Sequence, residues 1–247
     1  MLLNNKTIVN FGDSIFGNRR PPNDISTTLA KLTGATVYNC GFGGCRMSRH
    51  LENWDSFSMY RLAYSIANND WTLQDIAVNN SEWTEKPEYF DEALSLLKSI
   101  DFSKVDIVTI AYGTNDYTAC VSMENADDEK DIKTFSGALR YSIETLLGAY
   151  PHLKIFVCSQ TYRFWMDADG EYIDDSDIRI NNRGYKLPDY VQKTKEIATL
   201  YHLPFIDNYN IGMNKFTRSV YFSPTDGTHP IQPGCDLIAS NIAKNLF

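Results

Sequence analysis

The chain has 247 residues, a length that suits one large α/β domain with a buried core. Hydrophobic residues make up 43% and charged residues 22% of the chain, which is typical of a globular protein. Its formal net charge of -8 argues against a nucleic acid or an anionic membrane as a partner, because both need basic patches on the protein. Five cysteines, an odd number without C-x-x-C spacing, indicate neither a disulfide framework nor a structural zinc site.

The stretch 7–15 begins as a β-branched and aromatic run and stops at a serine. Such a run predicts a buried parallel strand, and Gly12 allows a sharp turn that lifts the next side chains out of the sheet. Ser14 would then stand at the carboxyl edge of the sheet, which is where open α/β sheets bind ligands. Ser14 is therefore the first candidate for a nucleophile.

The loop 15–22 follows this serine and should line the site. Its Arg19 and Arg20 could orient a substrate carboxylate or sugar hydroxyls, although a solvated basic loop is the simpler interpretation. A helix with apolar residues at i, i+4 and i+7 comes next, and a short strand at 36–38 follows it. This order of strand, helix and strand predicts a right-handed parallel crossover.

Two segments are longer than simple crossovers require. The first, residues 45–87, carries six aromatic residues, Trp54, Phe57, Tyr60, Tyr64, Trp71 and Trp83. We expect most of them to pack on the body of the domain, with one or two tryptophans left as substrate contacts, and an aromatic cap over the pocket is the alternative. The second, residues 161–187, has an Asp-Gly pair between aromatic ends, which predicts a projecting β-hairpin. That hairpin could shape the pocket rim or bury its aromatic side chains against another subunit.

The strand at 105–112 is a near-continuous apolar run that suits the centre of the sheet. It delivers the segment 113–116 to the same edge as Ser14. The acidic segment 124–131 is most simply a solvated loop, since its ligand spacing matches no calcium loop. The other predicted elements, in chain order, are a helix at 90–97, a helix at 132–147, a strand at 154–158, a helix from Pro188 to Leu200, a strand at 205–206 and a terminal helix at 237–246.

A serine hydroxyl is a weak nucleophile until a base takes its proton, so Ser14 requires a histidine, and the histidine requires an acid to orient it. Three of the four histidines, His50, His152 and His202, fit surface, turn or capping positions. His229 differs, because a carboxylate lies three residues before it and a glycine lies between. This spacing lets Asp226 fold back onto the Nδ1 side of His229 and leaves Nε2 facing the serine.

Four sequence blocks resemble, in order, the motifs of the SGNH or GDSL-type hydrolases. The first has isoleucine where leucine is usual, and the last matches D-x-x-H-P. The four blocks are Gly12-Asp13-Ser14-Ile15, Asn39-Cys40-Gly41-Phe42-Gly43-Gly44, Gly113-Thr114-Asn115-Asp116 and Asp226-Gly227-Thr228-His229-Pro230. This resemblance implies a three-layer α/β/α fold with a flavodoxin-like, five-stranded parallel sheet, in a single domain over residues 1–247.

The same resemblance implies a catalytic triad and an oxyanion hole. Ser14 would form an acyl-enzyme, with His229 as the base and Asp226 holding the imidazole tautomer. The oxyanion donors would be the backbone N–H groups of Ser14 and Gly44 and the side-chain amide of Asn115. The glycine-rich second block leaves the choice between Gly43 and Gly44 open.

Asp13 and Asp116 stand inside the motifs as acceptors that fix loops. Neither a metal nor another cofactor is needed for such chemistry.

The family includes carbohydrate O-acetylesterases, lysophospholipases, thioesterases and broad esterases. Aromatic-rich segments, many tyrosines and the lack of a lipid-like apolar stretch favour short acyl esters, and acetylated sugars among them. A lysophospholipase, a thioesterase, an acyltransferase or a non-catalytic carbohydrate-binding protein on the same scaffold are the alternatives. The oligomeric state is left open.

Because the serine stands at position 14, we expect no signal peptide upstream of it, and no apolar run reaches membrane-spanning length. A cytoplasmic location follows as an expectation.

Overall fold

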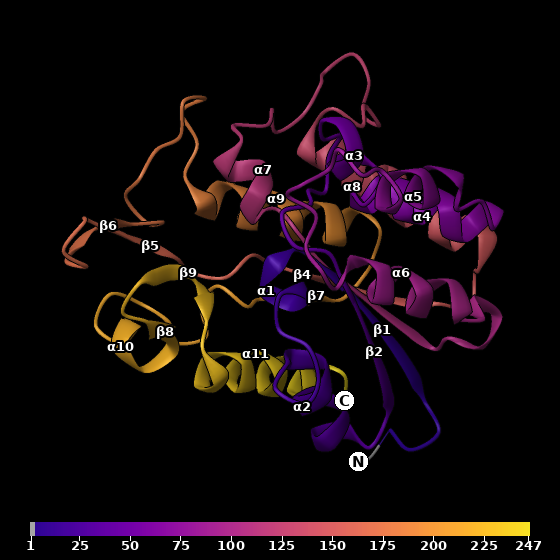
Figure 1. Ribbon diagram of the computed structural model, residues 1–247, viewed down its shortest axis with the longest axis horizontal. Helices are drawn as coiled ribbons and strands as arrows, with labels where there is room; N and C mark the ends of the chain where they lie inside the picture. The colour runs from indigo at the N-terminus through magenta and orange to yellow at the C-terminus, as the bar shows by residue number, and fades with distance from the viewer. Residues whose placement is uncertain (1–2) are drawn as a thin grey trace.

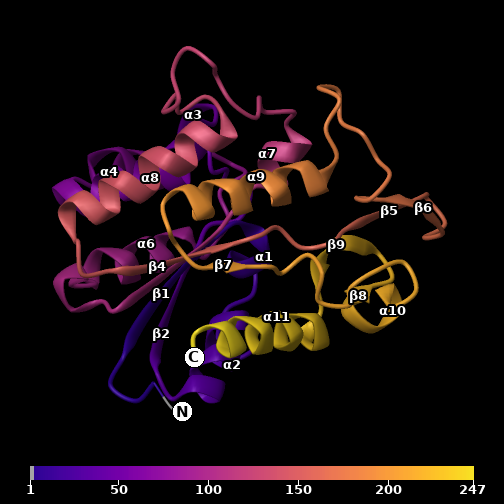
Figure 2. The same cartoon turned by 180° about the vertical axis from the view of Figure 1, so that it is seen from behind.

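The computed structural model describes residues 3–247 and is organised around a five-stranded parallel sheet (Figures 1 and 2). The strand order is β2-β1-β3-β4-β7, which is the flavodoxin-like order expected from the sequence. These strands are β1 (Thr7–Gly12), β2 (Thr36–Gly41), β3 (Ile107–Ala111), β4 (Lys154–Cys158) and β7 (Phe205–Ile206). All five residues of β3 are buried, because β3 lies between β1 and β4 and is covered on both faces.

Helices cover both faces of the sheet, which makes the fold a three-layer α/β/α sandwich. Figures 1 and 2 show α2 (Ile25–Thr33) and α11 (Gln232–Asn245) packed together on one face. The other face carries α4 (Met59–Asn68), α8 (Phe135–Ala149) and α9 (Leu187–Leu200), with α8 in contact with both of the others. The helix α6 (Phe90–Ser99) packs beside β2. Further short helices are α1 (Ser14–Gly17), α3 (Glu52–Asp55), α5 (Thr72–Val78), the 3-10 turn η1 (Phe102–Lys104), α7 (Thr114–Thr118) and α10 (Arg218–Tyr221).

Local capping explains where the helices begin and end. The Asp24 carboxylate accepts a hydrogen bond from the backbone N–H of Thr27 at 2.7 Å, and Gly34, with a φ of +74°, ends α2 in the left-handed conformation. The helix predicted from residue 132 begins at Phe135 instead. The reason is Thr134, whose hydroxyl accepts from the backbone N–H of Gly137 and therefore caps the helix.

The segment 45–87 folds into α3, α4 and α5. Phe57, Tyr60 and Trp83 are buried in the core, as predicted, whereas Trp54 and Trp71 are partly buried and Tyr64 is exposed. Phe57 and Trp83 pack around the ring of Phe90, with ring centroids 5.0 and 5.6 Å away. The prediction that most of these aromatics are structural is therefore confirmed.

The segment 161–187 contains the predicted hairpin. Strands β5 (Phe164–Met166) and β6 (Tyr172–Asp175) pair antiparallel, and the hairpin projects from the body of the fold (Figure 1). The Asp167 carboxylate accepts from the backbone N–H groups of Asp169 and Glu171 at 3.0 and 2.9 Å, and Gly170 has a φ of +82°. The turn thus uses a carboxylate acceptor and a left-handed glycine, which are the features that its sequence supplies.

A second small hairpin differs from expectation. The segment from Asp226, where no strand was predicted, forms β9 (Asp226–Pro230), which pairs antiparallel with β8 (Phe222–Ser223). Two pairs of residues suffice for this short ladder, so no alternating apolar pattern marks it in the sequence. Among residues 3–247, no helix has the length and apolar character needed to cross a membrane.

Candidate active site

Ser14 stands at the carboxyl edge of the sheet, as the first residue of α1 directly after β1. Asp13 caps this short helix, because its carboxylate accepts from the backbone N–H of Ile15 at 3.1 Å. The turn needs Gly12, since a Cβ atom there would lie 2.8 Å from the ring of Phe16. The close approach of α1 to β1 therefore fixes the position of Ser14.

His229 and Asp226 reach Ser14 from the other end of the chain, on β9. The hydroxyl Oγ of Ser14 lies 2.8 Å from His229 Nε2, and His229 Nδ1 lies 2.6 Å from Asp226 Oδ2. In the tautomer that satisfies both contacts, Nδ1–H donates to the carboxylate and Nε2 accepts from the serine. The arrangement is a continuous hydrogen-bonded chain from carboxylate to hydroxyl.

Asp226 is held as an anion. Its partial burial opposes the charge, but hydrogen bonds from the His229 side chain and from the backbone N–H groups of Thr228 and His229 lower the pKa of Asp226 to about 2. The His229 and Asp226 side chains are 37% and 40% exposed, so water reaches both of them. An ionised carboxylate at this position orients the imidazole and stabilises its protonated form.

The second and third sequence blocks meet beside Ser14. Asn115 Nδ2 donates to the carbonyl oxygen of Cys45 at 2.8 Å, which holds the Asn115 amide against the peptide that follows Gly44. Gly44 has a φ of +78°, and a Cβ atom there would lie 2.8 Å from the indole ring of Trp54. Only glycine fits this combination of conformation and contact.

Gly43 and Gly44 differ in what their N–H groups do. The N–H of Gly43 donates to the Tyr89 hydroxyl at 2.7 Å. No hydrogen bond among the described residues uses the N–H of Gly44 or that of Ser14. Of the two glycines, Gly44 is therefore the one with a donor to offer.

Asp116 fixes the loop that follows Gly44. Its buried carboxylate accepts from the backbone N–H groups of Met47 and Ser48 at 2.9 and 3.0 Å and from the Ser48 hydroxyl at 2.6 Å. Burial raises the pKa of Asp116, and these three donors act in the opposite direction. Burial also raises the pKa of Asp13, to about 6. Both aspartates accept hydrogen bonds from backbone N–H groups, Asp116 in the loop after Gly44 and Asp13 in the first turn of α1.

The other three histidines and the two arginines of the loop 15–22 lie outside the proposed triad. His152 and His202 are exposed, and His50 Nδ1 accepts from the backbone N–H of Leu51. The prediction of a solvated basic loop at 15–22 was wrong for its arginines. Arg19 Nε donates to the Pro230 carbonyl and Arg20 Nη1 to the Asn39 carbonyl, each at 3.2 Å, because the loop is clamped between β2 and β9.

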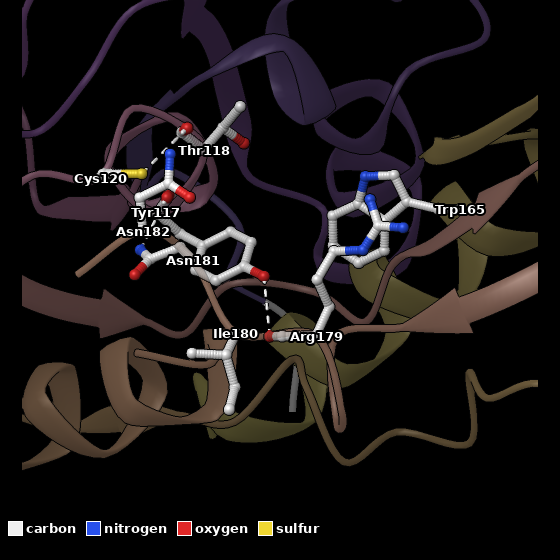
Figure 3. Close-up of a pocket in the computed structure, with 8 residues that line it drawn as sticks. All are labelled: Tyr117, Thr118, Cys120, Trp165, Arg179, Ile180, Asn181 and Asn182. Atoms are coloured by element: carbon white, nitrogen blue, oxygen red, sulfur yellow. Dashed lines mark hydrogen bonds between the residues drawn. The ribbon is translucent and has the colours of Figure 1, made fainter. Parts of the chain in front are cut away.

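A cavity of about 230 Å³ lies between α7 and the loop after β6 (Figure 3). Figure 3 shows the Arg179 guanidinium over the Trp165 ring and the Tyr117 hydroxyl donating to the Arg179 carbonyl, at 3.0 Å. Trp165, on the β5–β6 hairpin, therefore lines this cavity, and the role of the hairpin at the substrate pocket stays a prediction. The residues that line the cavity are Tyr117, Thr118, Cys120, Trp165, Arg179, Ile180, Asn181 and Asn182.

Sequence reasoning missed Arg163, which lies beside this cavity and also close to the candidate triad. Its guanidinium is half-buried and donates to the Thr118 hydroxyl at 2.9 Å. A signal for it existed, because Arg163 follows β4 at the carboxyl edge of the sheet, where ligands bind. Tyr89 was also missed, and nothing in its sequence surroundings marks it.

Within residues 3–247, no three His, Cys, Asp or Glu side chains gather as a metal site.

Comparison with known proteins supports the same assignment of family. The model of the GDSL-like Lipase/Acylhydrolase family matches residues 10–237. A search of curated protein sequences finds no match. Similar solved structures include a protein from Lactobacillus plantarum, with 19% identity, a TM-score of 0.67, and 99% of this chain and 97% of that one covered.

Two further structures share the fold. The native aryl esterase of M. smegmatis is 16% identical, with a TM-score of 0.61 and 98% of each chain covered. A salicylyl-acyltransferase from a tetracycline biosynthetic pathway is 13% identical, with a TM-score of 0.60, and the match covers 98% of this chain and 54% of that one. The motif resemblance is thus confirmed over most of the sequence, and the chain belongs to the GDSL-like lipase/acylhydrolase family of hydrolases.

Proposed function

We propose that this protein is a serine hydrolase that cleaves short-chain acyl esters through an acyl-enzyme on Ser14. The observation that carries the proposal is the unbroken contact from Asp226 through His229 to the Ser14 hydroxyl, at 2.6 and 2.8 Å. A protein that only binds carbohydrate has no need for this chain of contacts. The family membership supports hydrolase chemistry in the same way.

In the first half of the reaction, Ser14 Oγ attacks the ester carbonyl carbon while its proton moves to His229 Nε2. Asp226 stabilises the imidazolium that forms. When the tetrahedral intermediate collapses, the bond to the leaving alcohol breaks and Nε2–H protonates that alcohol. In the second half, water attacks the acyl-enzyme, gives its proton to Nε2, and the bond to Oγ breaks with return of the proton to Ser14.

The negative charge of both tetrahedral intermediates needs donors aimed at it. We assign this role to the backbone N–H groups of Ser14 and Gly44 and to the Asn115 side-chain amide. Nδ2 of Asn115 carries two hydrogens, and only one is used by the Cys45 carbonyl. The remaining donors of this set have no partner among the described residues.

The residues near the proposed oxyanion donors and Arg163 favour a short acyl group. The Trp54 ring lies against Gly44, where an added Cβ atom would be 2.8 Å from it, and the cavity beside Arg163 is lined by polar as well as aromatic residues. These features favour acetyl esters over long-chain lipids, and acetylated sugars are the first natural class to test.

The test is hydrolysis of p-nitrophenyl esters from acetate to long acyl chains by the wild type and by Ser14→Ala. We expect the highest kcat/KM with acetate and loss of nearly all activity in the variant. A rate that rises with chain length would favour a lipid or thioester substrate instead. An added sugar that becomes acylated would show acyl transfer, and two folded but inactive proteins would refute the proposal.

A further inference from the structure

Arg163 lies between the strand that carries Asp226 and His229 and the helix that carries Asn115. Strand β5, which begins at the next residue, packs against β9, so closely that a Cβ atom on Gly227 would lie 2.2 Å from the Phe164 carbonyl oxygen. On its other side, Arg163 Nη1 donates to the Thr118 hydroxyl at 2.9 Å, in the helix that also carries Asn115. The guanidinium is therefore held at the edge of the proposed active site.

Within residues 3–247, this guanidinium has no carboxylate partner. Among the described residues, no ion pair involves Arg163, Thr118 is the only hydrogen-bond acceptor of its side chain, and its buried Nε has no partner at all. Asp13 and Asp226 act on it electrostatically from beyond ion-pair distance, and each accepts hydrogen bonds elsewhere. Burial lowers the pKa of Arg163, as is usual for a charge that is desolvated without full compensation.

Arg179 offers a contrast on the same aromatic ring. The guanidinium carbons of Arg163 and Arg179 lie 4.6 and 4.2 Å from the centre of the Trp165 ring. Arg179 Nε, however, is paired with the Asp174 carboxylate at 2.9 Å. One of the two cations on Trp165 is thus neutralised, and the other is oriented by the ring and by Thr118 with most of its N–H groups unused.

We propose that Arg163 binds a carboxylate of the substrate, so that the natural substrates are esters that carry a negative charge near the scissile bond. This inference rests on the proposed esterase function and names its substrate class. A guanidinium with free, fixed N–H groups recognises a carboxylate through paired hydrogen bonds. In a chain of net charge -8, a local cation counteracts the long-range repulsion of an anionic substrate.

The test compares ester pairs that differ only in charge. With charge on the alcohol side, the pair is 4-acetoxybenzoate and 4-acetoxybenzamide. With charge on the acyl side, it is the monoethyl ester of adipic acid and the amide of that monoester. The readout is the ratio of kcat/KM for the anionic and neutral members, in the wild type and in Arg163→Gln, because intrinsic leaving-group effects cancel between enzymes.

We expect the ratio for at least one pair to fall by about tenfold or more in Arg163→Gln, which is the usual effect of losing hydrogen bonds to a charged group. Arg163→Lys should restore part of the ratio, because it keeps the charge but loses the planar fork. Arg140→Gln removes the same charge from α8, where Arg140 faces Glu129 at 3.5 Å, and should leave the ratio unchanged. In the wild type, added salt should reduce the anionic rate more than the neutral one.

Two results would overturn the inference. One is an equal fall in both rates of each pair in Arg163→Gln, which would mean that the arginine acts through Asp13 or Asp226 rather than on the substrate. The other is an unchanged ratio together with no selective effect of salt on the wild type, a measurement that does not depend on whether the variant folds.

A binding measurement tests the role of Arg163 independently of the proposed esterase activity. Titration calorimetry with 4-hydroxybenzoate and 4-hydroxybenzamide needs no catalysis, and we expect the wild type to bind the carboxylate more tightly. If neutral acetate esters are cleaved in a Ser14-dependent manner but neither binding nor rate favours the anion, the esterase proposal stands and the inference on Arg163 is rejected. If no ester is cleaved, the binding preference alone decides the role of Arg163.

Discussion

Asp13 is 1% exposed, and it precedes the proposed nucleophile. Burial raises its pKa from 3.8 to about 6, despite the hydrogen bond from the backbone N–H of Ile15. The folded protein therefore takes up a proton at higher pH than the unfolded chain does. The resulting contribution to stability is complete below a pH of about 4 and is lost as the pH rises through about 6.

Asp13→Asn should remove this pH dependence, because the amide oxygen still accepts from Ile15 but cannot ionise. Relative to the wild type, the variant should gain about 2 kcal/mol in the free energy of unfolding between pH 4 and pH 7.5. Urea unfolding at several pH values measures this difference. Parallel curves for the two proteins would show that Asp13 titrates normally in the folded state.

Asn115→Ala should lower kcat by about 10²–10³, the usual loss when one oxyanion donor is removed. The amide also holds the Cys45 carbonyl, so the unfolding midpoint of the variant should be recorded with its kinetics. A normal kcat in a folded variant would remove Asn115 from the mechanism.

Gly227 shows how a residue without a side chain can position the proposed base, His229. A Cβ atom there would lie 2.2 Å from the backbone oxygen of Phe164, so Gly227→Ala must push β9 away from β5. Because a displacement of about 1 Å can lower a rate by about 10²-fold, we expect a loss of that order in kcat/KM through movement of His229.

Gly148→Ala is the matched control for this substitution. Gly148 lies on an exposed part of α8 and has no atom within 4 Å of an added Cβ. Alanine there should raise the free energy of unfolding by roughly 0.5–1 kcal/mol with kcat/KM unchanged. Equal kinetics for the two glycine variants would contradict the role given to the contact between β5 and β9.

At the scale of elements, the segment 45–87 packs against the loop that carries Gly44. Phe42, Phe57 and Phe90 form an aromatic cluster with Trp83, and the Trp54 ring connects this cluster to Gly44. The aromatic cluster, through Trp54 of α3, thus packs against the loop that carries the proposed oxyanion donor.

Phe57→Ala should lower the free energy of unfolding by about 3–5 kcal/mol, since Phe57 is fully buried in this cluster. Leu51→Ala is the comparison in the same segment. Leu51 is 71% exposed, so its replacement should change the free energy by less than about 0.5 kcal/mol. Chemical denaturation of both variants checks the pair, and a small effect at Phe57 would mean that the cluster is not part of the cooperative core.

The elements also show what a sequence can predict. Apolar strands followed by glycine turns predicted that Ser14 and the segment 113–116 lie at one edge of the sheet, and the resemblance of the four motif blocks implied the order of the parallel strands and a place for His229 beside Ser14. The pairing of β8 with β9, the clamping of Arg19 and Arg20, and the position of Arg163 depend on contacts between distant segments. No local pattern encodes such contacts, so the structure was needed to find them.

At the scale of the whole molecule, the proposed site is assembled from both ends of the chain. Ser14 and His229 are separated by 215 positions in sequence, yet their side chains are in hydrogen-bond contact. β1 lies inside the sheet between β2 and β3, whereas β9 lies outside it and is held by β8 and β5. The geometry of the proposed triad therefore depends on the docking of the β8–β9 hairpin onto a sheet formed largely by earlier residues.

The turn of the β5–β6 hairpin is exposed, and it lies in the sequence between the N-terminal part, which carries Ser14, and the C-terminal part, which carries His229. A cut between Asp167 and Gly170 would leave Ser14 and Asn115 on one fragment and Asp226 and His229 on the other. Neither fragment could cleave an ester by the proposed mechanism, but the two together hold every part of it. This hairpin is consequently a natural position for a split enzyme, in which two proteins fused to the halves would report their association as ester hydrolysis.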